Sequence, residues 1–209
     1  MDGRQSEDNL TFCNVSVKEL RYILILCSTD GSVCAFLCAV AIAAMIFFRL
    51  FTLLTHRLLL YMLIAVMCYS SLVAIQLLAL WRDYLLNKEY ANDCIAEGFL
   101  LMYFAWVMLL ATLMVTLHLT SMVLFPSLFQ KLTKMEPFYL LFPWIFPLFI
   151  VWIPFVHSNY GISGSWCWIR LYNEDCTQNK EGVIEEYAVW YGELIVGLVF
   201  NNIALLAIA

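Results

Sequence analysis

Charged residues are scarce in this chain. Only 13% of its 209 residues are Asp, Glu, Lys or Arg, whereas 64% are hydrophobic, and the mean hydropathy is +0.84. A soluble globular domain needs more polar surface than this composition supplies. The composition therefore excludes a soluble domain and predicts an integral membrane protein whose apolar exterior contacts the lipid bilayer.

The signatures of common enzyme classes are also missing. The sequence contains no His-Glu-x-x-His motif, no Gly-x-Ser-x-Gly motif and no glycine-rich phosphate loop. We place His56 and His118 near one membrane face and His157 near the other, too far apart to share a metal ion. The net charge of −5 disfavours nucleic acid as a partner. We expect a protein without enzymatic activity, metal or cofactor.

Long apolar stretches account for most of the chain, and each is long enough to cross about 30 Å of hydrocarbon as a helix rising about 1.5 Å per residue. The first twenty residues are polar and contain no apolar signal segment, so the first helix is predicted to direct its own insertion. The fold class is therefore an all-α membrane protein, with a tail over residues 1–21 and a transmembrane domain over 22–209. Its five helices are predicted at about 22–48, 58–81, 94–125, 137–157 and 187–209.

The orientation is predicted from glycosylation signals and charge. Two sequons, at Asn9 and Asn14, precede the first helix and receive glycan only if this end enters the lumen. The count of Lys and Arg does not decide the orientation, but the net charge is +3 in loops 49–57 and 126–136 and −5 in the other extramembrane segments. We predict an extracellular N-terminus, glycosylated at both sites, and an intracellular C-terminus.

Cysteines support the same orientation. Cys13, Cys94, Cys167 and Cys176 all fall in the segments placed outside, where disulfides form. We pair Cys94 with Cys167, which leaves Cys13 for Cys176, although Cys176 competes for Cys94. The other four cysteines lie within helices and are interpreted as small packing residues.

Three short motifs resemble those of one receptor group. They are Cys94-Ile95-Ala96-Glu97-Gly98-Phe99 at the start of the third helix, Pro143-Trp144-Ile145-Phe146-Pro147 in the fourth, and Ser165-Trp166-Cys167-Trp168-Ile169 beyond it. Together they resemble the cyclic-AMP-receptor-like G-protein-coupled receptors, a group similar to the secretin (family 2) receptors. The resemblance implies a plasma-membrane receptor that signals through a heterotrimeric G protein in response to an extracellular ligand.

Departures from related receptors narrow the resemblance. The third helix ends in His118-Leu119-Thr120 without an Asp-Arg-Tyr triplet, which disfavours the rhodopsin-like class. The tail is too short for the ectodomain of secretin receptors. A receptor of this kind has seven helices, so the five predicted here form a partial bundle. We expect a fragment of a longer receptor, or a truncated isoform that does not signal.

Acidic residues inside the apolar helices are candidates for a ligand site, because a charge in the bilayer is costly. Asp30, Glu97 and Glu193 all fall in the outer third of their helices. With Gln76 they form a predicted outward-facing pocket for a cationic or hydrogen-bonding ligand, whose aromatic members are Tyr103, Trp106, Trp168 and Tyr191. The alternative is that Glu97 and Glu193 are hydrated near the interface and that Asp30 bonds locally to Ser28, Thr29 or Ser32.

Two other functions stay open. A small transporter would carry helix breakers beside buried acids, and Gly31 next to Asp30 is the one such pair. A membrane assembly protein could pair with full-length copies through its helices. The receptor interpretation is preferred, because the expected disulfide fastens an outer loop to the third helix.

Overall fold

The computed structural model describes residues 11–12, 15–83, 91–163, 166–173 and 175–208. Helices dominate, and the described residues also form two short antiparallel hairpins, β1 with β2 before α1 and β3 with β4 between α7 and α8. The strands are β1 (Thr11–Phe12), β2 (Val15–Ser16), β3 (Tyr160–Ser163) and β4 (Trp166–Ile169). The helices are α1 (Val17–Phe47), η1 (Leu50–Thr52), α2 (Leu54–Asp83), α3 (Ala91–Leu124), α4 (Pro126–Lys134), α5 (Glu136–Ile145), α6 (Pro147–Ile150), α7 (Ile153–Val156), α8 (Lys180–Glu186), the π-helical turn η3 (Tyr187–Tyr191) and α9 (Gly192–Ile208).

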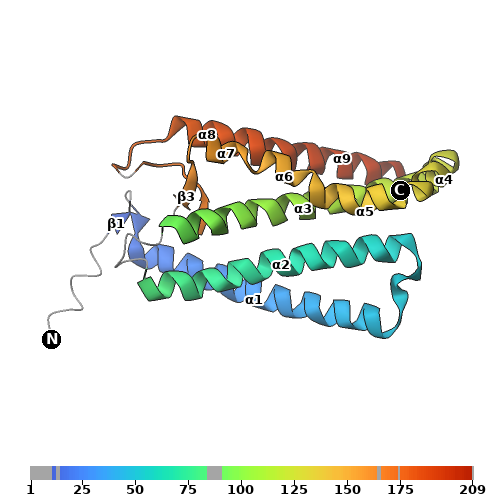
Figure 1. Ribbon diagram of the computed structural model, residues 1–209, viewed down its shortest axis with the longest axis horizontal. Coiled ribbons are helices and arrows are strands. Elements are labelled where there is room, and N and C mark those ends of the chain that lie inside the picture. Colours follow the sequence, from blue (N-terminus) through green and yellow to red (C-terminus); the bar gives the residue numbers. More distant parts are fainter. Residues whose placement is uncertain (1–10, 13–14, 84–90, 164–165, 174, 209) are drawn as a thin grey trace.

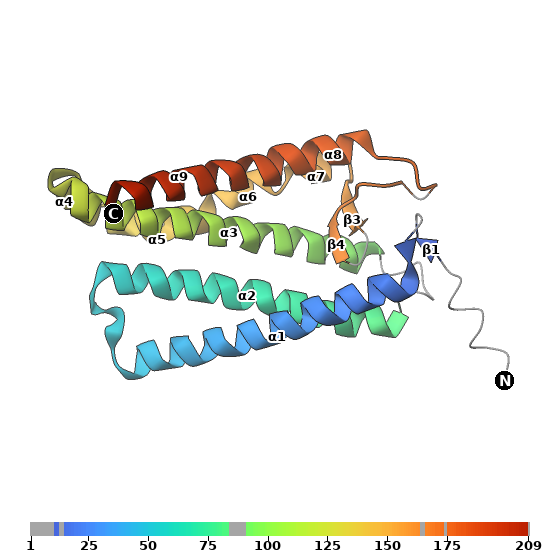
Figure 2. The same ribbon diagram turned by 180° about the vertical axis from the view of Figure 1, so that it is seen from behind.

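Five helical segments are long and apolar enough to cross a membrane, which confirms that part of the prediction. They cover Arg21–Phe47, Leu54–Gln76, Asp93–Leu124, Glu136–Val156 and Lys180–Ile208. The fourth of these spans, formed by α5, α6 and α7, is called helix four, and the fifth, formed by α8, η3 and α9, is called helix five. Both views show α3 between the α1–α2 pair on one side and α5, α6, α7 and α9 on the other (Figures 1 and 2). The β3–β4 hairpin and the starts of α1 and α3 lie at one end of the bundle, here called the hairpin end, and α4 lies at the other (Figure 1).

Three helix boundaries differ from the predicted ones. Helix α1 begins at Val17, inside the expected tail, and carries Glu19 in its first turn, where an acid favours a helix start. Helix α2 begins at Leu54 rather than near residue 58, because Leu54 and Leu58 are buried together against helix four. The fifth span begins at Lys180, because the polar segment 180–186 is a helical turn rather than a loop.

Small residues bring α1 and α2 close together. A Cβ added to Gly31 would lie 2.8 Å from the carbonyl oxygen of Ser70, so this position admits little more than glycine. The hydroxyl of Ser28 donates to the Ala74 carbonyl at 2.9 Å. Close backbone approach with a hydroxyl bond across helices is typical of packing within membranes. Gly31 lies inside the continuous helix α1 and is a packing residue rather than the helix breaker that a transporter would use.

Prolines divide the fourth span into α5, α6 and α7, which leaves two breaks along it. Tyrosine hydroxyls satisfy carbonyls close to both breaks. Tyr103 of α3 donates to the Trp144 carbonyl at 2.9 Å. Tyr160 of β3 donates to the Val151 carbonyl at 2.8 Å, where the Phe155 amide bonds to Trp152 instead of continuing the α-helical pattern. These bonds offset the cost of leaving backbone carbonyls unpaired in an apolar environment.

Candidate functional site

The β3–β4 hairpin is fixed to the start of α3 by a covalent bond and by close packing. Cys94 and Cys167 form a disulfide with their α-carbons 5.2 Å apart, the pairing that the sequence analysis preferred. Next to it, a Cβ on Gly98 would lie 3.2 Å from the Tyr160 ring and 3.3 Å from the Trp168 amide nitrogen. The hairpin therefore lies directly on the helix at the point where glycine leaves room.

Some predicted features of the N-terminal tail fall on residues that the structure does not describe. Cys176 is disulfide-bonded, while Cys13, its expected partner, lies outside the described residues. The glycosylation sites Asn9 and Asn14 lie outside them as well. Glycosylation and the second disulfide pair therefore stay predictions from the sequence.

Trp106 joins α3 to the π-helical turn η3. Its side chain is 1% exposed, and its Nε1 donates to the Val189 carbonyl at 3.0 Å. A π-helical turn interrupts the regular ladder of an α-helix and is frequent at functional sites. The indole N–H thus supplies a partner for a buried carbonyl in this turn and fixes the fifth span against the third.

Trp168 connects the hairpin to the same turn. Its indole is buried, packs in a T-shaped arrangement with the Trp190 ring at a centroid distance of 5.7 Å, and interacts with the Glu186 carboxyl at the end of α8. Trp106 and Trp168 belong to one apolar cluster at the hairpin end. This cluster forms the rigid part of the candidate site.

Gln76 and Glu97 provide an incompletely satisfied polar pair close to the hairpin. Gln76 is 3% exposed, and its Nε2 has no hydrogen-bond partner in the part of the chain that the structure describes. The Glu97 carboxyl lies near this amide, but their geometry falls short of a full hydrogen bond. Glu97 directly precedes Gly98, on which the hairpin packs. Buried donors are nearly always paired in proteins, so this amide is open to a water molecule or a ligand.

The other candidates from the sequence do not join this pair. Tyr103 is directed toward helix four through its bond to Trp144. Tyr191 is 39% exposed and contacts the Tyr187 ring at 5.2 Å. Glu193 forms no hydrogen bond or ion pair with any described residue. The structure thus does not bring Tyr103, Tyr191 and Glu193 together with Gln76 and Glu97.

Asp30 is exposed on α1, away from the hairpin cluster. The local bonds expected for it are absent from the described residues, because the nearby hydroxyls bond to backbone carbonyls. Ser28 donates to Ala74, Thr29 to Leu26 and Ser32 to Ser28. A carboxylate on the surface of an apolar helix needs water or another protein segment around it.

A polar network at the hairpin end was not found by sequence reasoning. Glu185 of α8 is 7% exposed, and each of its carboxylate oxygens has a partner. Oε1 lies 2.6 Å from Nδ1 of His157, which follows α7, and Oε2 accepts from Nδ2 of Asn159 at 2.8 Å. The network therefore joins the end of helix four to the start of helix five.

Asn179 ties the hairpin into the same network. Its side-chain amide donates to the Asn159 side chain at 2.9 Å and to the Arg170 carbonyl at 3.1 Å, and its carbonyl oxygen caps α8 through the Gly182 amide at 3.2 Å. A Cβ on Gly182 would lie 2.1 Å from the Arg170 carbonyl oxygen, so only glycine fits there. An Asn three residues before a Gly at a helix start is a capping signal that was present in the sequence.

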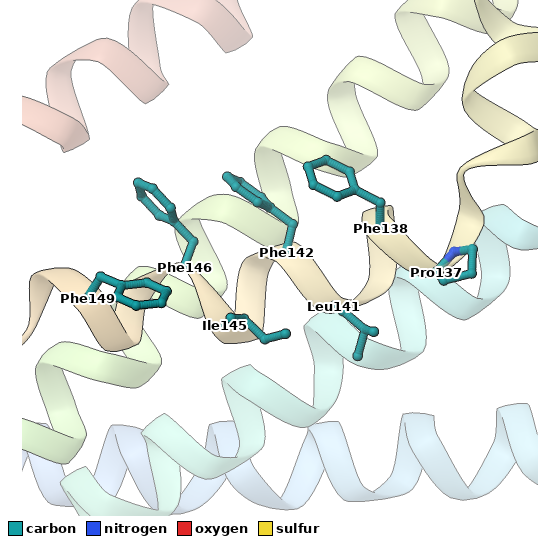
Figure 3. A pocket seen from close by; sticks show the side chains of 7 residues that line it. All are labelled: Pro137, Phe138, Leu141, Phe142, Ile145, Phe146 and Phe149. Atoms are coloured by element: carbon teal, nitrogen blue, oxygen red, sulfur yellow. The ribbon is translucent and has the colours of Figure 1, made fainter.

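A groove of about 400 Å³ lies along helix four and does not include the polar residues of the network. Phe138, Phe142 and Phe146 point to one side of the helix in a row, while Leu141 and Ile145 point to the other (Figure 3). The lining is wholly apolar and contains none of the predicted ligand residues. It belongs to the apolar surface of a segment that is long and apolar enough to cross a membrane.

Comparison with known proteins assigns the chain to no group, since no family model and no curated protein matches it. Among the described residues there is no set of three or more His, Cys, Asp or Glu side chains that could hold a metal ion.

Proposed function

We propose that the chain is the ligand-receiving part of a receptor-like protein of the plasma membrane, with its N-terminus outside, that responds to an extracellular ligand at the hairpin end. As part of a longer receptor it would couple to a heterotrimeric G protein. The observation that carries the proposal is the hairpin held on the start of α3 by the Cys94–Cys167 disulfide and the Gly98 contact. Such a fixed cap can position the polar side chains beneath it.

The ligand contacts in this proposal are Gln76 and Glu97. Glu97 has no ion pair with a described residue, and the neighbouring Gln76 donor is buried and unsatisfied. The ammonium group of a ligand would bind the Glu97 carboxylate, and a hydroxyl oxygen of the same ligand would accept a hydrogen bond from Gln76 Nε2. The charge-assisted bond between ammonium and carboxylate contributes about 1.5–3 kcal/mol, and the neutral bond between amide and hydroxyl about 0.5–1.5 kcal/mol. The ligand class favoured here is therefore a small hydroxylated amine.

Binding of tyramine, which carries both groups, tests this proposal. We expect saturable binding to the whole protein in lipid nanodiscs, and a loss of affinity of about tenfold or more in Glu97→Gln, because the amide cannot neutralise the ammonium group. Glu193→Gln is the matched control and should bind as the parent does, since Glu193 contacts neither group. Absence of saturable binding to the parent, or equal affinity in the parent and Glu97→Gln, would contradict the proposed ligand site.

A further inference from the structure

The contact between His157 and Glu185 joins an accessible group to a buried one. The His157 side chain is 50% exposed, whereas that of Glu185 is 9% exposed, and Nδ1 and Oε1 are 2.6 Å apart. His157 lies just beyond the fourth span, which ends at Val156. Protons from the aqueous phase therefore reach the His157 imidazole directly, while the Glu185 carboxylate is shielded from water.

Three segments meet at this contact. His157 follows α7, Glu185 belongs to α8, and Asn159 links both to the hairpin, because its carbonyl accepts from the Arg170 amide at 2.7 Å directly after β4. The Asn179 side chain bonds to Asn159 and to the Arg170 carbonyl. A change in the strength of the His157–Glu185 contact therefore acts on the attachment of the hairpin to helix five.

The charged groups around the contact are mainly acidic. Glu181 and Glu186 lie on α8 with Glu185, and Tyr160 of β3 is close enough to interact electrostatically with Glu185. Arg170 directs its guanidinium Nη2 to the Ser158 carbonyl and forms no ion pair with a described acid. Lys180 begins α8 and forms no ion pair with Glu185, so His157 is the basic side chain that contacts the buried carboxylate within the described residues.

The direction of the pH effect follows from this arrangement. The hydrogen bond to Glu185 raises the pKa of His157 above its ordinary value of 6.5; desolvation offsets part of this rise, and the charges of Glu181 and Glu185 add to it. A group whose pKa is raised on folding contributes its full stabilisation below the unfolded pKa. This contribution is lost as the pH rises through the raised folded pKa. The contact is strongest in mildly acidic medium and weakest in alkaline medium.

We propose that the hairpin end is proton-responsive, with protonation of His157 tightening the junction of the hairpin with helix five and deprotonation loosening it. A partly exposed histidine paired with a buried carboxylate has the features of a pH-dependent switch at an interface between elements. The proposal does not rest on the ligand site, because its readout is the stability of the junction and needs no ligand. Failure of tyramine binding would leave it intact.

NMR titration of the histidine ring carbons in the whole protein in nanodiscs provides the first test. The chain has three histidines, so the signal of His157 is assigned by its loss in His157→Gln. We expect a pKa above 6.5 in the parent and a pKa close to 6.5 in Glu185→Gln. Glu181→Gln, a matched loss of charge one helical turn away, should lower the pKa less. Equal pKa values in the parent and Glu185→Gln would overturn the proposal.

Hydrogen exchange of the Arg170 amide, corrected for the intrinsic effect of pH, measures the junction itself. In the parent we expect the opening equilibrium to increase between pH 6 and pH 8, by up to about tenfold for each unit that the measured pKa of His157 exceeds 6.5. His157→Gln keeps a side-chain donor but cannot be charged, so its opening should not vary with pH over this range. The same pH dependence in the parent and His157→Gln would show that the junction does not respond to this histidine.

Discussion

Replacement of Cys94 and Cys167 together by serine is expected to lower the free energy of unfolding by about 4 kcal/mol under non-reducing conditions. The bond closes a segment with a sequence separation of 73 residues, and removing it frees that loop in the unfolded chain. The hairpin should also loosen from α3, since only packing contacts, those around Gly98 and those of Tyr160 and Trp168 in the apolar cluster, then hold it there. Unfolding in denaturant measures the first effect, and hydrogen exchange of the β3 and β4 amides measures the second.

The free cysteines provide the control for this variant. Cys27 and Cys68 are partly buried within helices and form no disulfide. Replacing them together by alanine should change the unfolding free energy far less than removal of the bonded pair. If the variant without Cys94 and Cys167 unfolds at the same denaturant concentration as the parent, the disulfide does not hold the hairpin end together.

Trp106→Ala is expected to destabilise the protein by about 3–5 kcal/mol. The side chain is 1% exposed, its ring contacts Phe146 of helix four, and its Nε1 satisfies the Val189 carbonyl in η3. The substitution leaves a cavity between three spans and a buried carbonyl without a partner. The loss is measured by thermal or denaturant unfolding in detergent micelles.

Two companion variants separate the causes. Trp106→Phe keeps most of the ring but removes the N–H, so we expect a loss of about 1–3 kcal/mol from the unpaired carbonyl. Trp152→Ala removes a tryptophan that is 57% exposed, and its effect should be much smaller. Equal losses in Trp106→Ala and Trp152→Ala would contradict the role of Trp106 as the link between the third and fifth spans.

The spans could be predicted from the sequence because apolar length decides them, but their ends depend on tertiary contacts. Leu54 extends α2 because Tyr139 of another helix covers it, and no pattern within residues 54–58 shows that contact. The segment 180–186 is rich in acids, and its composition predicts a loop before the fifth helix. It forms a helix because Asn179 caps it and Glu185 finds partners in residues that follow helix four.

The candidate site could be predicted only in part, because it too depends on tertiary contacts that the sequence does not show. Cys94 and Cys167 could be paired because Cys94 opens the third helix and Cys167 lies in the long loop beyond the fourth, at the same membrane face. The sequence groups Asp30, Tyr191 and Glu193 with Glu97, because all four are expected near the outer ends of their helices. This depth does not determine whether a side chain points into the bundle or away from it. Trp106 was selected as a ligand contact, and the structure gives its N–H to a backbone carbonyl in a π-helical turn, a feature that no local sequence signal indicated.

The central proposal is that the hairpin end lies on the extracellular side of the membrane and is fixed there to the third helix. The most direct measurement is a non-reduced peptide map of the protein from cells whose free thiols are blocked with N-ethylmaleimide before lysis. Because disulfides persist in oxidising compartments, the account predicts a Cys94 peptide joined to a Cys167 peptide, with maleimide only on the free cysteines Cys27, Cys34, Cys38 and Cys68. Maleimide on both Cys94 and Cys167 would contradict the orientation and the fixed hairpin together.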